Sequence, residues 1–114
     1  MPEIERDKSI IEHIKNYCEE IEQTIKRFGS MDENLENDND YKKSLAMSIL
    51  QIGELETHLS ENFKENNAVI PWKNIKAMRN IVAHGYGKID WEIVNEVAKN
   101  DIPVLKRFCE EKLK

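Results

Sequence analysis

The sequence predicts an all-α protein, a compact antiparallel bundle of about five helices. Three observations support this prediction. Apolar residues recur at steps of three and four along the chain, and no segment alternates apolar and polar residues as a strand would. Glycine and proline, which interrupt helices, number only four and three among 114 residues. The length suits one domain, so residues 1–114 are expected to share a single core.

The first predicted helix spans about 20 residues, from an N-cap at Asp7 to a stop at Gly29. Residues 30–40 then gather five carboxylates and three Asn, which predicts a solvated acidic loop. The apolar face of the helix consists of Ile10, Ile11, Ile14, Cys18, Ile21, Ile25 and Phe28.

A second long helix is predicted from Tyr41 to Phe63. Gly53 lowers its helix propensity, and we therefore expect another helix to approach closely at that point. The apolar positions between the two ends are Leu45, Ile49, Ile52, Leu55 and Leu59.

The remaining chain predicts three shorter helices. Pro71 can open the third, because the first turn of a helix leaves its N–H groups unpaired, and Gly85 and Gly87 predict that it ends close to His84. Asp90 is expected to cap the fourth helix, and Asp101 with Pro103 to begin the fifth. The inward-facing residues are Trp72, Ile75, Met78 and Val82, then Ile93, Val94 and Val97, then Leu105, Phe108 and Leu113.

Composition excludes several classes of protein. The longest apolar run is a few residues, and residues 1–7 contain no apolar signal region, so a cytoplasmic protein without a membrane span is expected. Cys18 and Cys109 fall on apolar helical positions, which favours reduced core thiols over a disulfide or a metal site. A net charge of −5 argues against a general nucleic-acid coat protein, but not against an enzyme that binds one or two phosphates.

The charge distribution predicts a local anion site. Residues 66–89 contain Lys73, Lys76, Arg79 and Lys88 but neither Asp nor Glu, so they carry +4 while the other residues carry −9. Cationic side chains gathered at one place on an acidic protein favour a phosphate ligand. The three lysines are therefore expected to contact phosphates of the ligand.

The same segment holds a constellation of polar residues at positions 79–86. Arg79 offers a forked, permanently charged donor to a phosphate, and His84 belongs to the residue type that exchanges protons near neutral pH. Asn80 is expected to orient the imidazole or to contact the substrate, and Tyr86 to donate a hydrogen bond or to stack on a base. If the helix ends near Ala83, the chain can turn His84 and Tyr86 toward Arg79.

These residue types suit RNA cleavage by attack of the 2′-hydroxyl on its own phosphate, which needs acid–base help and charge stabilisation but no metal or cofactor. One catalytic His per chain is few for both a base and an acid, so a homodimer with two copies of the pair around one cleft is predicted. A metal site is not expected, because His13, His58 and His84 lie on separate elements without ligand partners. Judged by chemistry alone, an Arg, a His and a Tyr near a helix end also fit a structural helix cap.

The motif Arg79-x4-His84-x-Tyr86 matches the R-x4-H-x-Y signature of HEPN-domain ribonucleases, specifically the HepT-like toxins of prokaryotic toxin–antitoxin pairs. The resemblance covers roughly Gln51 to the C-terminus. Three further segments resemble family patterns: Ile52-Gly53-Glu54 (I-G-E), Ile70-Pro71-Trp72 (I-P-W) and Asn100 to Leu105 (N-D-[IL]-P-x-L).

This resemblance implies a helical dimer with metal-independent endoribonuclease activity, in which Arg79 and His84 are catalytic and Asn80 is a polar helper. It also implies a partner, a minimal nucleotidyltransferase antitoxin that transfers AMP to Tyr86. Gly85 and Gly87 depart from the family, which often has Asp and an aromatic residue there. Two alternatives stay open. One is a catalytically inactive HEPN module that binds the nucleotidyltransferase or a nucleotide. The other is a structural helical dimer without a nucleic-acid role.

Overall fold

The computed structural model describes residues 2–28 and 39–114, apart from the side chains of Phe28 and Tyr86. The described residues form helices and turns and contain no strand, which confirms the all-α class. The helices, in chain order, are α1 (Glu3–Phe28), α3 (Asn39–Thr57), α4 (Glu61–Asn66), α5 (Trp72–His84), a 3₁₀ turn (Tyr86–Lys88), α6 (Trp91–Glu96), a π-helical segment (Val97–Asp101) and α7 (Ile102–Lys112).

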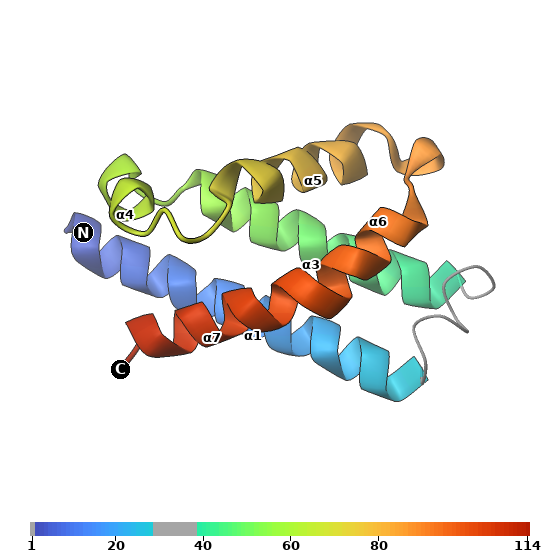
Figure 1. Ribbon diagram of the computed structural model, residues 1–114, viewed down its shortest axis with the longest axis horizontal. Coiled ribbons are helices and arrows are strands. Elements are labelled where there is room, and N and C mark those ends of the chain that lie inside the picture. Colours follow the sequence, from blue (N-terminus) through green and yellow to red (C-terminus); the bar gives the residue numbers. More distant parts are fainter. Residues whose placement is uncertain (1, 29–38) are drawn as a thin grey trace.

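The long helices run antiparallel to their neighbours (Figure 1). α3 packs against α1 on one side and α5 on the other, while α7 packs against α1. Both chain ends lie at the same end of the bundle, opposite the 3₁₀ turn. Within the described ranges, no helix is long and apolar enough to cross a membrane.

The first helix begins four residues before the predicted cap. Glu3 and Glu5 occupy its first turn, where carboxylates complement the helix dipole. Asp7 lies inside the helix and is buried, so its prediction as N-cap is wrong. Its carboxylate instead accepts hydrogen bonds from Ser60 N (2.9 Å) and Ser60 Oγ (2.6 Å), which joins α1 to the start of α4. The predicted stop at Gly29 lies outside the described residues.

The second predicted helix is divided in two. α3 ends at Thr57, and Ser60, with an extended backbone, caps the new helix α4 by accepting a hydrogen bond from Phe63 N at 3.1 Å. The four-residue apolar spacing continues across this break, which is why periodicity alone misses it. At the other end, Asn39 and Asp40 belong to α3 rather than to the predicted acidic loop, and residues 30–38 lie outside the described part.

The last two predicted helices are continuous. Asp90 caps α6, as expected, by accepting hydrogen bonds from Glu92 N (3.0 Å) and Ile93 N (3.4 Å). A π-helical segment then leads directly into α7, and Asp101 makes no side-chain cap. Pro103 lies within the first turn of α7, where a helix tolerates proline, so it does not interrupt the helical path. Ile93 is 49% exposed, which contradicts its predicted inward position.

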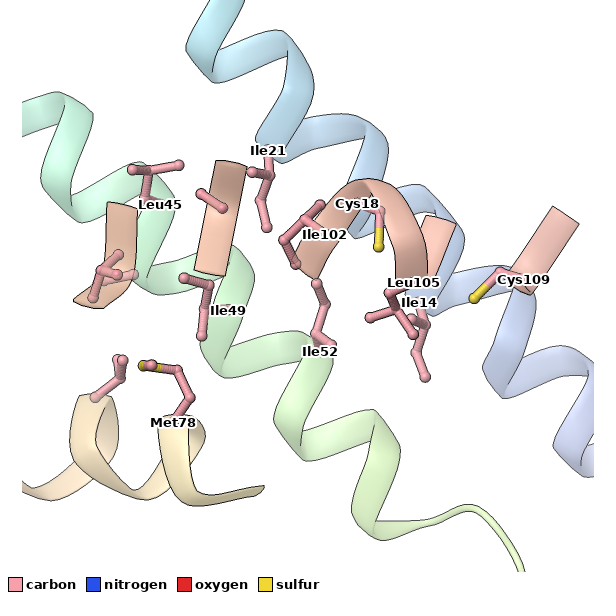
Figure 2. Close-up of a cluster of buried hydrophobic side chains, with 14 of the residues drawn as sticks. Ile14, Cys18, Ile21, Leu45, Ile49, Ile52, Met78, Ile102, Leu105 and Cys109 are labelled. Atoms are coloured by element: carbon pink, nitrogen blue, oxygen red, sulfur yellow. The ribbon is translucent and has the colours of Figure 1, made fainter. Parts of the chain in front are cut away.

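The core lies where α1, α3, α5 and α7 meet (Figure 2). Cys18 and Cys109 are both fully buried and free, which confirms their predicted positions in the core. Burial raises the pKa of Cys109 to about 12, and it also raises the pKa of Cys18 well above its usual range. Figure 2 labels other buried residues of this core: Ile14, Ile21, Leu45, Ile49, Ile52, Met78, Ile102 and Leu105.

An aromatic cluster anchors the start of α5. The rings of Phe63, Trp72 and Phe108 contact one another with centroids 5.9–6.2 Å apart. Trp72 also donates its indole N–H to the carbonyl of Asn67 at 3.1 Å. Because Trp72 is the first residue of α5, these contacts hold the helix on which the predicted site residues lie.

Candidate functional site

Arg79 lies on the side of α5 that faces α3, directly against Gly53. A Cβ placed on Gly53 would overlap the Cβ of Arg79 and lie 2.6 Å from its Cγ. Glycine is therefore required for this crossing, and the close approach predicted from Gly53 is confirmed.

The guanidinium of Arg79 is held from two sides. Its Nε and Nη2 both contact Oε1 of Glu54, and its Nη1 donates to Oδ1 of Asn80 at 2.8 Å. The Arg79 side chain is 26% exposed and that of Glu54 is 40% exposed. An ion pair at this exposure contributes only about 0–1 kcal/mol to folding. Of the five N–H groups of an arginine, two remain free for a ligand such as a phosphate.

His84 is the last residue of α5 and is exposed to solvent. Gly85 follows as the C-cap and donates its N–H to the carbonyl of Ile81 at 2.9 Å. The helix thus continues one residue past Ala83, and His84 does not turn back toward Arg79 as expected. Five residues along an α-helix amount to about 140° around its axis. Within one chain, Arg79 and His84 therefore lie on different sides of α5, and no hydrogen bond joins them.

Asn80 pairs with Arg79 in this arrangement, and its role in orienting the imidazole or contacting the substrate stays a prediction. Its amide oxygen accepts from the guanidinium, which leaves the amide N–H₂ available to a substrate. The backbone of Tyr86 begins the 3₁₀ turn that follows Gly85, while its side chain lies outside what the structure describes.

A stripe of polar residues runs along the exposed side of α5. Lys73, Lys76, Asn80 and His84 recur at steps of three and four, so they share one side of the helix, and all four are exposed. Lys88 is exposed on the 3₁₀ turn beyond. None of these three lysines takes part in an ion pair with a described residue. They therefore keep their charge available to an anion.

Sequence analysis missed the role of Glu54 as the partner of Arg79. The carboxylate-free segment from residue 66 to 89 suggested an unopposed positive charge, but the helix packing brings a carboxylate from α3 to it. Two features of the sequence pointed to Glu54. Gly53 predicted a close helix approach, and an acidic residue follows that glycine directly.

An apolar groove of the described structure is separate from these polar residues. Its volume is about 320 Å³, and it lies between α5 and the stretch formed by α6, the π segment and α7. Ile49 and Ile52 of α3 line it together with residues of both walls, among them Met78 and the half-exposed Ile93 and Val104. Neither Arg79 nor His84 lines it. In the described part of the chain, no three His, Cys, Asp or Glu side chains gather to suit a metal ion.

An all-α bundle that carries Arg79 and His84 at the C-terminal part of one helix has the form of a HEPN-like domain. The model of a family described as Ribonuclease HepT-like matches residues 14–111 of this chain. The match includes most of α1, which the motifs alone did not distinguish from any amphipathic helix. The chain belongs to the HepT-like ribonuclease family.

Individual relatives carry names that agree with this family. "Putative RNase TTE0752" of Caldanaerobacter subterraneus is 30% identical over 101 residues, which cover 89% of this chain and 88% of the relative. "Putative RNase MJ1380" of Methanocaldococcus jannaschii is 34% identical over 59 residues, 52% of this chain and 54% of the relative. "Probable ribonuclease HepT" of Thermococcus cleftensis is 34% identical over 55 residues, 48% of this chain and 50% of the relative. No solved structure matches well enough to extend the comparison.

Proposed function

We propose that the protein is the toxin of a prokaryotic toxin–antitoxin pair, an endoribonuclease that cleaves RNA without a metal ion at a site formed across a homodimer. The observation that carries this proposal is the surface of α5. An ordered guanidinium with two free N–H groups borders a stripe that contains two lysines and ends in an exposed histidine.

The reaction assigns a role to each of these groups. The 2′-oxygen of a ribose attacks the neighbouring phosphorus, the bond from phosphorus to the 5′-oxygen breaks, and a 2′,3′-cyclic phosphate forms. A base accepts the proton of the 2′-hydroxyl and an acid protonates the leaving 5′-oxygen, and imidazole suits either step. Arg79 stabilises the negative charge that builds up on the phosphate oxygens. The nucleophile belongs to the RNA itself, so the chemistry requires no metal-bound water.

The separation of Arg79 and His84 around α5 supports a composite site. A second copy packed near α5 would bring its own His84 toward Arg79 of the first chain and would supply the second imidazole. Two large apolar side chains near this end of α5 are partly exposed, Ile81 at 44% and Ile93 at 49%. Burying them in an interface would contribute favourably to dimerisation.

The lysines and Tyr86 extend the site on either side. Lys73, Lys76 and Lys88 are proposed to contact phosphates that flank the cleaved one, which would make RNA binding strongly dependent on salt. Tyr86 follows His84 by two residues. We propose that it accepts AMP from a minimal nucleotidyltransferase antitoxin, which would add a negative charge two residues beyond His84.

One alternative has an observation in its favour. Glu54 already pairs with Arg79 in the isolated chain, which lowers the net positive charge offered to RNA. A catalytically inactive module that binds the nucleotidyltransferase or a nucleotide would have this property. It would bind its partner but would not cleave RNA.

Cleavage in the presence of a chelator distinguishes these proposals. The purified protein is incubated with an RNA strand and with a strand of the same sequence that lacks every 2′-hydroxyl. We expect cleavage of the RNA alone, with 2′,3′-cyclic phosphate ends detected by mass spectrometry. His84→Ala should lower the rate about 10²–10⁴-fold, whereas His13→Ala, which removes another exposed histidine, should cleave normally. Inhibition by the chelator would contradict metal independence, and cleavage by His84→Ala at the wild-type rate would exclude this site.

A further inference from the structure

The contact between Gly53 and Arg79 determines the direction in which the arginine side chain leaves α5. A Cβ at Gly53 would lie 3.4 Å from the Arg79 Cα and would overlap its Cβ. The first carbons of the side chain thus lie across the bare backbone of Gly53. They lead to the next residue of α3, Glu54.

Glu54 then determines the orientation of the guanidinium. One oxygen, Oε1, contacts both Nε and Nη2, while Asn80 accepts from Nη1 on another side of the group. Because the guanidinium is planar and rigid, contacts at these three nitrogens leave it little freedom to rotate. Its two remaining N–H groups are thereby directed before any ligand arrives.

A comparison within the molecule separates orientation from stability. Glu22 of α1 and Lys106 of α7 also join two helices, at 2.8 Å, with side chains 42% and 28% exposed. The pair of Glu54 and Arg79 has nearly the same exposure, 40% and 26%. Both pairs should therefore contribute equally little to folding. The two pairs differ in that Glu54 contacts a residue of the candidate site.

We propose that Glu54 is a positioning residue, which holds the guanidinium of Arg79 in the orientation that receives the RNA phosphate, and that Gly53 lets the arginine reach it. This inference rests on the proposed ribonuclease function. Preorganised donors stabilise charge in a transition state more effectively than donors that must first reorient. The negative charge of Glu54 also offsets the positive charge of Arg79. Glu54 can therefore favour cleavage only through the orientation that it gives to the guanidinium.

Three variants test this proposal in a cleavage assay with RNA. Glu54→Ala removes the acceptor and should lower kcat by about 10–100-fold, the size of effect that a small misplacement causes. Its KM should stay close to that of the wild type, because the lysines retain their phosphate contacts. Glu54→Gln keeps an oxygen that can accept from the guanidinium and should keep most of the wild-type kcat. Glu22→Ala removes the matched ion pair and should leave kcat and KM unchanged.

Two results would overturn the proposal. Glu54→Ala with wild-type kcat would show that Arg79 needs no orientation by α3. Loss of kcat in Glu54→Gln as large as in Glu54→Ala would show that the negative charge or a proton on Glu54 matters instead. Thermal unfolding of each variant, expected to match that of Glu22→Ala, separates either result from a loss of fold.

A second readout does not depend on cleavage. In the wild type, the Nε–H signal of Arg79 in ¹⁵N NMR spectra should exchange slowly with water, because Glu54 accepts its proton, and it should exchange fast in Glu54→Ala. Fast exchange in the wild type would overturn the inference even for an active enzyme. Slow exchange in a wild-type protein that cleaves no RNA would refute the proposed function, while the orientation of Arg79 by Glu54 would stand.

Discussion

Arg79 and His84 lie on the same helix but on sides of it about 140° apart. Arg79 faces α3 and contacts Glu54, while His84 is exposed at the C-terminal end of α5. Within one chain, no hydrogen bond joins the two proposed catalytic groups. This relationship gives the dimer hypothesis a specific consequence.

Mixing two impaired variants should restore part of the cleavage. In a heterodimer of Arg79→Ala and His84→Ala chains, one composite site contains an intact Arg79 from one chain and an intact His84 from the other. Each variant alone should cleave at a strongly reduced rate. The mixture, allowed to exchange subunits, should cleave faster than either variant but more slowly than the wild type, because the heterodimer lacks the second imidazole. Light scattering should give the mass of a dimer for the wild type. A mixture that cleaves no faster than its two components, although its subunits exchange, would contradict a site that takes Arg79 from one chain and His84 from the other.

Arg79→Lys tests whether charge alone is enough. Lysine keeps the positive charge but lacks the planar fork that contacts Glu54 and Asn80 while donating to a phosphate. We expect a loss in kcat of about 10²–10³-fold, close to that of Arg79→Ala, because the transition-state contact is lost. Single-turnover cleavage measures the chemical step directly. If Arg79→Lys retains most of the activity, a point charge at this position is sufficient.

Gly53→Ala should destabilise the protein, although alanine normally favours a helix by about 1 kcal/mol over glycine. The added Cβ would overlap the Cβ of Arg79, and forcing extra atoms into a packed contact costs about 1–3 kcal/mol. Urea unfolding followed by circular dichroism measures the change. Gly87→Ala, which introduces a Cβ where no atom lies within 4 Å, serves as the stability control. An unchanged or higher stability in Gly53→Ala would mean that α5 can shift without cost.

Adenylylation of Tyr86 should inhibit cleavage. The phenol oxygen would attack the α-phosphorus of ATP, lose its proton and release pyrophosphate, leaving AMP attached to Tyr86. A tethered anion competes at high effective concentration with the RNA phosphate. Modified protein should cleave poorly, and Tyr86→Phe should stay active after incubation with ATP and the nucleotidyltransferase. Mass spectrometry that maps AMP to another residue, or full activity of the modified protein, would refute this regulation.

The buried thiols predict a loss of stability at high pH. The pKa of Cys109 rises from its ordinary 9.0 to about 12 in the folded protein, because burial disfavours the thiolate, and that of Cys18 shifts in the same direction. The folded state therefore binds these protons more tightly than the unfolded state. Their contribution is fully present below pH 9 and is lost as the pH rises toward about 12.

Urea unfolding at about pH 8 and about pH 10.5 measures this dependence. The wild type should lose more stability between the two values than a variant with Cys18→Ala and Cys109→Ala, which controls for Lys and Tyr titration. Equal losses in both proteins would show that the thiols do not contribute.

Much of the helical arrangement followed from local patterns. The apolar faces of α1, α3 and α5, the position of Pro71 before α5 and the cap at Asp90 were predicted correctly, because each depends on residues within one or two turns. The errors share a physical cause. Apolar spacing continued across the break at Ser60. Asp7 accepts a hydrogen bond from the distant Ser60, and Asp40 lies within α3. Local spacing reveals neither environment.

The sequence by itself determined the all-α class, the buried faces and the motif of Arg79, His84 and Tyr86, since periodicity and residue type are local properties. Only the tertiary structure decided what surrounds Arg79. Glu54 is 25 residues away in the chain, and it reaches the guanidinium because Gly53 lets α3 and α5 approach closely. It also decided that His84 lies on another side of α5, because the helix continues through that residue and its pitch determines the angle.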